Sequence, residues 1–194
     1  GPDGFKQVAK TDSNIFLDLK LHDIPNTVAK AVRSLMPLRP SIMTIHTAGG
    51  PAMMAAAAVA ATEAAENVGC ARPIIVGVTI LTSLDDEDLK AVGYQNKVSD
   101  QVVRMAMLAK ENGLDGVVCS PHEISLIKEA CGKDFKLVVP GIRPAGSAKE
   151  DQKRIMTPNE AVKLGADYLV IGRPITQAGD PAIAAQQIAN EING

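Results

Sequence analysis

The interpretation of this chain depends on the stretch Asn14-Ile15-Phe16-Leu17-Asp18-Leu19-Lys20-Leu21-His22-Asp23-Ile24-Pro25-Asn26-Thr27, which places charged residues in what otherwise has the composition of a buried strand. Side chains alternate along a strand, so Phe16, Asp18 and Lys20 share one face, and the intervening apolar residues share the other. Such a charged face is typical either of the solvated side of an antiparallel sheet or of a functional site. The rest of the chain favours the functional site.

The composition is that of one globular domain over residues 1–194. Of these residues 46% are hydrophobic, which is enough to bury one sizeable core. Twenty basic against 22 acidic residues leave a net charge of −2, too balanced for binding to nucleic acid or a membrane surface through bulk charge. No apolar run approaches the ~20 residues that span a bilayer. We therefore expect neither nucleic acid nor a membrane as a partner.

The three cysteines, Cys70, Cys119 and Cys131, are odd in number and lack the spacing of a metal site. They are typical of the reduced thiols of a cytosolic protein. We therefore predict a cytoplasmic location, with neither a zinc site nor a disulfide.

Six strand patterns follow one another, and each precedes apolar residues at helical spacing. The strands are predicted at 14–21, 41–46, 73–81, 114–119, 135–142 and 167–172. The helices are predicted at 24–36, 51–66, 98–112, from 120, at 157–165 and at 181–192, with a further helix start at 85–87. Asp23 is placed to cap the first helix, and capping boxes begin at Ser120 and Thr157. This alternation indicates a parallel sheet wrapped by helices, either an open doubly wound sheet or a (β/α)8 barrel.

Two segments with features of anion sites decide between these folds. The last two predicted strands end in Pro140-Gly141-Ile142-Arg143 and Ile171-Gly172-Arg173-Pro174, where a flexible backbone stands beside an arginine suited to phosphate. TIM barrels commonly bind phosphate after strands seven and eight. The sequence therefore predicts the last six βα units of a TIM (β/α)8 barrel, with two units expected before residue 1. The polar loop 143–156 is longer than a usual βα connection, which favours a functional role.

The motifs resemble those of the orotidine 5′-monophosphate decarboxylase family, in its bacterial branch. Residues 18–27 resemble the family's Asp-x-Lys-x-x-Asp signature with its Ile-Pro-x-Thr continuation. The resemblance continues in order through segments 81–83, 115–120, 139–143 and 171–174, and covers essentially the whole chain. The ribose-binding aspartate and the tetrad lysine of the family's first two strands have no counterpart in residues 1–194.

The resemblance implies conversion of orotidine monophosphate to uridine monophosphate and carbon dioxide, a step of de novo pyrimidine biosynthesis that needs no metal or other cofactor. Loss of the carboxylate leaves a poorly stabilised carbanion at C6, so a fixed cation is needed there. Lys20 is the candidate cation and proton donor. Asp18 would orient its ammonium, and the charge of Asp18 would crowd the substrate carboxylate.

The resemblance also implies a homodimer with composite active sites. The family places the equivalents of Asp23, Ile24 and Thr27 across the interface, in the site of the partner. From the residues alone, a cap of the following helix is the favoured explanation of Asp23.

The remaining candidates for contact with the substrate also follow from the resemblance. The 5′-phosphate would be held by Gly172, Arg173 and Gln152, with Arg143 as a second cation. Pro140 and Ile142 would line the base pocket, and Thr82 would lie near the pyrimidine edge. For Thr82 the alternative is a helix cap shared with Ser83, and for Gln152 it is an ordinary solvated loop residue.

Two rival functions remain at this point. One is a magnesium-dependent sugar-phosphate lyase of the same superfamily, which uses a similar Asp-x-Lys-x-x-Asp strand. Residues 24–27 and the loop around Gln152 argue against it. The other is an inactive nucleotide-binding fragment, motivated by the missing tetrad lysine.

Overall fold

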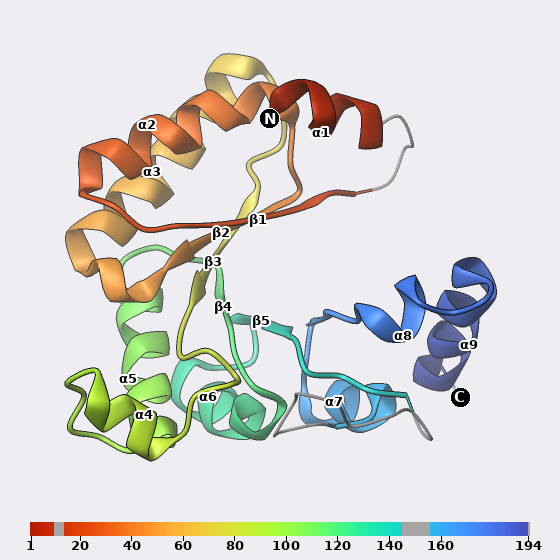
Figure 1. The fold of residues 1–194 in the computed structure, drawn as a ribbon. Coiled ribbons are helices and arrows are strands. Elements are labelled where there is room, and N and C mark those ends of the chain that lie inside the picture. Colours follow the sequence, from red (N-terminus) through yellow and green to blue (C-terminus); the bar gives the residue numbers. More distant parts are fainter. Residues whose placement is uncertain (10–13, 145–155, 194) are drawn as a thin grey trace. The chain divides into compact units, whose positions relative to one another are not determined.

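The computed structural model describes residues 1–9, 14–144 and 156–193, and it confirms the predicted alternation of strands and helices (Figure 1). The described strands are β1 (Phe16–Leu21), β2 (Ile42–His46), β3 (Ile74–Val78), β4 (Gly116–Val118), β5 (Lys136–Val139) and β6 (Tyr168–Leu169). The described α-helices are α1 (Pro2–Val8), α2 (Pro25–Leu35), α3 (Pro51–Val68), α4 (Asp86–Ala91), α5 (Val98–Glu111), α6 (Ile124–Cys131), α7 (Pro158–Leu164), α8 (Arg173–Thr176) and α9 (Pro181–Asn193). The 3-10 helices are η1 (Met36–Leu38), η2 (Thr47–Gly49) and η3 (Pro121–Glu123).

The six strands lie in one sheet in chain order, β1-β2-β3-β4-β5-β6. The pairs β1–β2, β2–β3 and β5–β6 are parallel. A doubly wound sheet would reverse its strand order at a switch point, whereas consecutive units of a barrel keep the order of the chain. The fold is therefore α/β, with six βα units of the TIM (β/α)8 barrel class.

The chain divides into two compact units. Unit 1 comprises Gly1–Val78 and Leu108–Gly116, and unit 2 comprises Thr79–Met107 and Val117–Gly194. The single domain over residues 1–194 stays a prediction.

In unit 1 the helices α2 and α3 pack against each other on the same side of β1 and β2 (Figure 1). Helix α2 buries Val28, Ala29 and Val32. Helix α3 is rich in alanine and buries six of its alanines along with Met53 and Met54. Small side chains allow two helices to approach closely, so the alanine-rich segment serves packing.

Several element boundaries differ from the predicted ones. The strand predicted at 73–81 is hydrogen-bonded as β3 over 74–78 alone, and the one predicted at 135–142 ends as β5 at 139. Pro140 has no N–H for the ladder, and Gly141 has a φ of 80°, so the extended strand cannot continue. Helix α1 was not predicted. It begins with Pro2 in its first turn and Asp3 beside it, which are ordinary features of a helix start.

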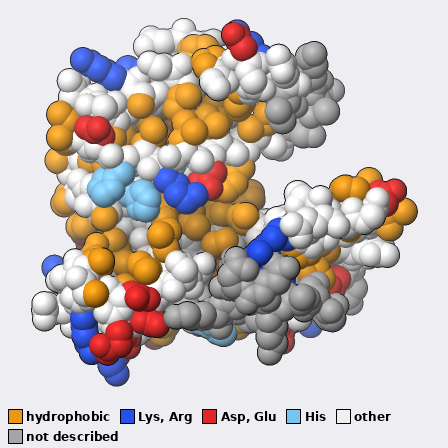
Figure 2. Space-filling view, viewed as in Figure 1, with side chains coloured by type: hydrophobic (Ala, Val, Ile, Leu, Met, Phe, Trp, Pro, Cys, Tyr) orange, Lys and Arg blue, Asp and Glu red, His pale blue; other side chains and the backbone are white. Residues whose placement is uncertain are grey.

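Helix α4 begins at a different cap from the one considered in the sequence. Asp85 is its N-cap, and the carboxylate of Asp85 accepts the N–H groups of Glu87 and Asp88 at 3.1 Å each. Acidic side chains gather over this helix (Figure 2). Those in its first turn interact favourably with the positive end of the helix dipole. Thr82 and Ser83 therefore do not cap α4.

Two aspartates occupy equivalent places at the start of strands, one in each unit. Asp115 precedes β4, donates its N–H to the carbonyl of Ile75 at 3.0 Å, and accepts the N–H of Ile75 and Nη1 of Arg72 at 2.7 Å each. Asp167 precedes β6 and repeats the exchange with Leu137, at 3.0 Å and 2.9 Å. Each aspartate thus ties the start of its own strand to the strand before it in the sequence.

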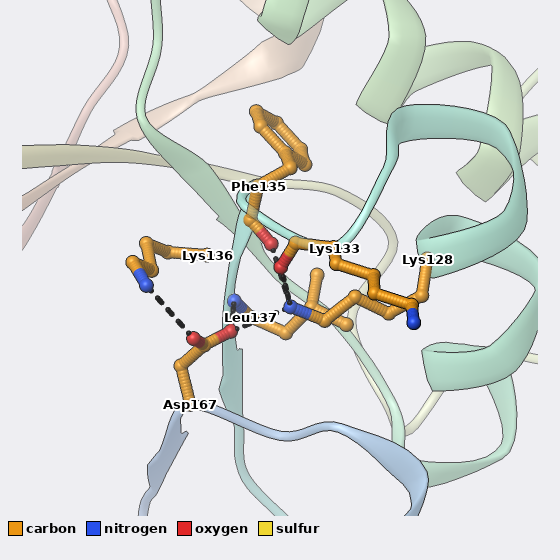
Figure 3. A network of polar contacts seen from close by, with 6 residues as sticks. All are labelled: Lys128, Lys133, Phe135, Lys136, Leu137 and Asp167. Atoms are coloured by element: carbon orange, nitrogen blue, oxygen red, sulfur yellow. Dashed lines mark hydrogen bonds and ion pairs between the residues drawn. The ribbon is translucent and has the colours of Figure 1, made fainter.

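Asp167 also gathers two lysines around its carboxylate (Figure 3). Nζ of Lys128 donates to Oδ2 at 2.8 Å and to the carbonyls of Lys133 and Phe135 at 2.9 Å each. Nζ of Lys136 donates to Oδ1 at 3.1 Å. The Lys128 and Asp167 side chains are 15% and 20% exposed, so water screens this ion pair less than it would a surface pair.

Replacing Asp167 by alanine should lower the free energy of unfolding by about 2 kcal/mol at neutral pH, the size typical of lost hydrogen bonds to charged groups. Burial alone would raise the pKa of Asp167, but hydrogen bonds from Lys128, Leu137 and Lys136 outweigh it and hold the pKa below its ordinary value. A lowered pKa stabilises the fold above the unfolded-state pKa of about 3.9, and this contribution is lost as pH falls through the folded-state pKa. Urea unfolding should therefore show the difference from wild type shrinking below about pH 4.

The matched control is Asp134→Ala, at an exposed acidic residue of the turn before β5. It should change the free energy of unfolding by less than about 0.5 kcal/mol. An Asp167→Ala variant as stable as wild type at neutral pH would show that the network does not stabilise unit 2.

Candidate active site

Strand β1 carries a bulge at the residues singled out by the sequence. Its pairing with β2 is regular up to Leu17 and Met43, but the next pair is Leu21 with Ile45. Four steps along β1 therefore correspond to two along β2, and Lys20 has a φ of 51°, in the left-handed region. This backbone conformation costs a lysine roughly 1–2 kcal/mol. The predicted alternation fails at Leu19, which is 48% exposed although the pattern placed it on the apolar face, because the bulge interrupts the regular ladder.

Asp18 and Lys20 form an ion pair inside this bulge. Nζ of Lys20 donates to Oδ2 of Asp18 at 2.5 Å. The hydroxyl of Thr44, on β2, donates to Oδ1 of Asp18 at 2.8 Å and accepts the N–H of Lys20, also at 2.8 Å. We call this closed set of hydrogen bonds the Asp18–Thr44–Lys20 ring. It holds a cation and an anion in fixed positions although their side chains are 42% and 41% exposed.

Two histidines lie at the ends of the same two strands. His22 follows β1 and His46 ends β2, and their ring centroids are 5.3 Å apart. Burial lowers the pKa of His46, the charges of His22 and Lys20 lower it further, and Asp18 acts in the opposite direction. His46 is therefore neutral at physiological pH. Figure 2 shows histidine side chains on the surface of the protein, beside one basic and one acidic side chain.

Helix α2 begins with the residues expected at an interface. Asp23, Ile24 and Thr27 are all exposed, and 66% of Ile24 is accessible. The N-cap residue of α2 is Ile24, and Oδ1 of Asp23 accepts its N–H at 2.7 Å. The prediction that Asp23 caps the helix is therefore wrong. Pro25 has no N–H, so the first helical position needs no cap at all.

The segment after β5 holds three of the predicted binding residues. Ile142 is fully buried and forms a parallel bridge with Met156, whose carbonyl accepts the N–H of Arg143 at 3.0 Å. Nη1 of Arg143 donates to the carbonyl of Ile142 at 3.2 Å, and only 7% of Arg143 is exposed. Pro140 is half-buried. Arg143 is thus held in place by its own segment.

The segment after β6 holds Gly172 and Arg173. Gly172 is the N-cap of α8, and its carbonyl accepts the N–H groups of Ile175 at 2.9 Å and Thr176 at 3.0 Å. Arg173 begins the helix and is half-buried. A Cβ placed on Gly172 would meet no heavy atom within 4 Å, so its backbone is open to approach. Gln152 lies outside the described residues.

Of the predicted site residues, the structure places Asp18 and Lys20 in direct contact. Asp18 and Lys20 meet in unit 1, the segments 140–143 and 172–173 belong to unit 2, and Thr82 lies half-buried in the turn after β3. Among the described residues, no group of three or more His, Cys, Asp or Glu is placed to hold a metal ion. No helix in the described part of the chain is long and apolar enough to cross a membrane.

Sequence reasoning missed Thr44. Its signal was a single polar residue in the apolar strand Ile42-Met43-Thr44-Ile45, and Thr44 is in fact fully buried. Buried hydroxyls need hydrogen-bond partners, and this one finds them on the neighbouring strand. Chemically, the ring presents a fixed ammonium beside a fixed carboxylate, which suits a reaction that develops negative charge near the ammonium.

Comparison with known sequences gives a consistent result. The sequence model of the family described as "Orotidine 5'-phosphate decarboxylase / HUMPS family" matches residues 1–188. The orotidine 5′-phosphate decarboxylase of Moorella thermoacetica is 54% identical over 193 residues, which are 99% of this chain and 77% of that protein. The one from Paramagnetospirillum magneticum is 53% identical over 192 residues, which are 99% of this chain and 82% of that protein.

Solved structures agree with the sequence comparison. The crystal structure of orotidine 5′-phosphate decarboxylase from Lactobacillus acidophilus matches with a TM-score of 0.88 and 38% identity, over 100% of this chain and 82% of that one. An uncharacterized conserved protein from Geobacillus kaustophilus matches with a TM-score of 0.86 and 39% identity, over 100% of this chain and 82% of that one.

Proposed function

Because this chain belongs to the orotidine 5′-phosphate decarboxylase / HUMPS family, we propose that it converts orotidine 5′-monophosphate to uridine 5′-monophosphate and carbon dioxide. The reaction is that of a cofactor-independent carboxy-lyase in pyrimidine biosynthesis. The observation that carries the proposal is the ion pair of Lys20 with Asp18, fixed inside the bulge of β1.

The proposed chemistry begins at the ammonium of Lys20. The bond between C6 and the carboxylate breaks, carbon dioxide leaves, and the electron pair of the bond stays on C6. The positive charge of Lys20 stabilises the carbanion, because a fixed cation does not have to reorganise as the charge develops. A proton then passes from Nζ to C6, and the amine regains a proton from water.

Asp18 has two roles in this proposal. Its Oδ2 holds Nζ of Lys20 in place, and Oδ1 is itself held by Thr44. Its negative charge would also stand near the substrate carboxylate, where like charges repel, and this repulsion is relieved when carbon dioxide leaves.

We assign the remaining candidates to binding of the substrate. Gly172, Arg173 and Gln152 bind the 5′-phosphate, with Arg143 as a second cation. The open backbone at Gly172 supports this assignment, and the burial of Arg143 makes its role one of shaping the segment as well. Thr82, Pro140 and Ile142 contact the pyrimidine.

The decisive experiment measures uridine monophosphate formed from orotidine monophosphate, with and without EDTA. It uses the 194-residue chain and the same chain joined to the first two βα units of the Moorella relative. The term "active form" is used below for whichever of these two proteins converts orotidine monophosphate to uridine monophosphate. Turnover insensitive to EDTA supports the decarboxylase, whereas EDTA-sensitive action on a sugar phosphate would favour the magnesium-dependent lyase. No turnover by the 194-residue chain alone would make that chain an inactive binding fragment.

We further propose a cytoplasmic homodimer whose sites are shared between subunits. Asp23, Ile24 and Thr27 would act in the site of the partner subunit. A large apolar side chain that is 66% exposed, as Ile24 is, supports an interface at the start of α2. None of the three cysteines, Cys70, Cys119 and Cys131, is part of a disulfide, which suits the reducing cytoplasm.

Mixing inactive Lys20→Ala subunits with inactive Asp23→Ala subunits of the active form should restore activity. One site of each mixed dimer then receives both wild-type groups. Random mixing makes half of the dimers hybrid, each with one intact site, so roughly a quarter of the wild-type activity is expected. The measurement is the initial rate after unfolding and refolding the two variants together.

The control for this experiment is Lys20→Ala mixed with Lys30→Ala, at an exposed lysine of α2. This mixture should show only the activity contributed by the Lys30→Ala subunits. If mass spectrometry shows hybrid dimers of the Lys20→Ala and Asp23→Ala variants but activity does not return, Asp23 acts within its own subunit.

A further inference from the structure

Thr44 occupies the most regular part of the sheet in unit 1. The pairing of β2 with β3 is unbroken from Ile42 to His46, and Thr44 is in register with Val76. Thr44 is 0% exposed, and its strand neighbours Met43 and Ile45 are 2% and 0% exposed. Its backbone is therefore fixed by pairing and its side chain by close packing.

The neighbouring strand β1 is irregular at the residues that lie opposite Thr44. The three residues 18–20 of β1 lie between register pairs that enclose Thr44 alone on β2. A bulge removes ladder hydrogen bonds, and here the N–H of Lys20 is satisfied by the side chain of Thr44. The hydroxyl thus takes the place of a backbone acceptor and holds Lys20 at its positive φ.

A single hydroxyl group makes two of the three hydrogen bonds of the ring. It has one proton and two lone pairs, so it can donate to Oδ1 of Asp18 while it accepts the N–H of Lys20. Fixing Oδ1 also fixes the direction of Oδ2, on which Nζ of Lys20 rests. One atom of Thr44 therefore determines both the backbone of Lys20 and the position of its ammonium.

We propose that Thr44 is a positioning residue for the decarboxylation, acting through Asp18 and Lys20 without touching the substrate. This inference rests on the proposed function. Without the hydroxyl, Lys20 relaxes out of the left-handed region, and its ammonium moves from the place where charge develops at C6. The loss falls on the chemical step and leaves nucleotide binding unchanged.

The test compares Thr44→Val with Thr44→Ser in the active form. Valine keeps the shape of threonine and removes the hydroxyl, whereas serine keeps the hydroxyl and removes the methyl group. Thr44→Val should lower kcat on the order of 100-fold, the effect of displacing a reacting group by about 1 Å. Its dissociation constant for uridine monophosphate should stay at the wild-type value, and Thr44→Ser should keep most of the wild-type kcat.

Thr62→Val is the matched control, since Thr62 of α3 also has a hydrogen-bonded hydroxyl but lies outside the ring. It should leave kcat unchanged. The proposal is overturned by a wild-type kcat for Thr44→Val, or by equal losses for valine and serine. A parallel loss of kcat, uridine monophosphate affinity and thermal stability in Thr44→Val would also overturn it, because that pattern indicates a structural role.

A crystal structure of Thr44→Val tests the geometry independently of any activity. The proposal expects Lys20 to lose its positive φ and Nζ to leave Oδ2 of Asp18. If both features persist, Thr44 does not position Lys20, whatever reaction the protein performs. If the wild-type active form fails to decarboxylate orotidine monophosphate, the proposed function is wrong, and this structure still decides the role of Thr44.

Discussion

Replacing Lys20 by alanine in the active form should abolish nearly all decarboxylation of orotidine monophosphate. The variant loses the only group to which we assign both stabilisation of the C6 carbanion and its protonation. The loss of transition-state stabilisation should be at least about 4 kcal/mol, or roughly a thousandfold in kcat/KM. Steady-state kinetics measures it, and binding of uridine monophosphate shows whether the variant still folds around a nucleotide.

Exchange of the C6 hydrogen of uridine monophosphate with solvent deuterium isolates the carbanion from the departure of carbon dioxide. Wild type should catalyse this exchange and Lys20→Ala should not. Lys30→Ala, at an exposed lysine of α2, is the matched control and should exchange at the wild-type rate. Exchange by Lys20→Ala at the wild-type rate would mean that another group is the proton donor.

The ion pair of Asp18 with Lys20 is better explained by catalysis than by stability. Both side chains are about two-fifths exposed, and exposed ion pairs contribute ~0–1 kcal/mol to folding. The left-handed backbone of Lys20 costs about as much, roughly 1–2 kcal/mol. The local arrangement therefore yields little net stability, which is common where geometry serves a reaction.

The sequence could predict this pair but not its geometry. Asp18 and Lys20 could be identified as candidates because charged residues are unusual in an apolar strand, and the alternation of side chains along residues 14–21 placed both on one face. The bulge depends on how β1 pairs with β2, and Thr44 is 24 residues away from Lys20 in the chain. A local pattern carries no information about such pairing, so neither the bulge nor its contact with Thr44 could be predicted.

The starts of the helices also show which features a local sequence pattern can predict and which it cannot. The capping box that begins at Thr157 was predicted correctly. The carboxylate of Glu160 accepts the N–H of Thr157 at 3.0 Å, and the hydroxyl of Thr157 accepts the N–H of Glu160 at 3.4 Å. The cap at Asp23 was misassigned by one residue, since Pro25 allows the helix to begin without a side-chain cap.

The burial of Arg143 could not be predicted from the sequence either. An arginine after a strand and a Pro-Gly pair suggested a second cation for the phosphate. Its burial follows from the bridge between Ile142 and Met156, which brings together residues from the two ends of the long loop. Arg173 is only half-buried at the start of α8, so it is the stronger candidate for the phosphate.

Replacing Arg173 by alanine in the active form should lower kcat/KM for orotidine monophosphate by about 3 kcal/mol, roughly 150-fold, as expected for loss of a charge-assisted contact to phosphate. Part of the loss should appear in kcat, because binding energy from a remote group can be used to reach the transition state. Added guanidinium should restore part of the activity by occupying the vacated position.

The nucleoside orotidine provides the sharpest check on this assignment, since it lacks the phosphate. Wild type and Arg173→Ala should have the same low kcat/KM for orotidine, because orotidine has no phosphate for Arg173 to contact. Arg104→Ala, at an exposed arginine of α5, should match wild type on both substrates. If Arg173→Ala loses as much on orotidine as on the nucleotide, Arg173 supports the fold of the segment after β6 and is not the phosphate ligand.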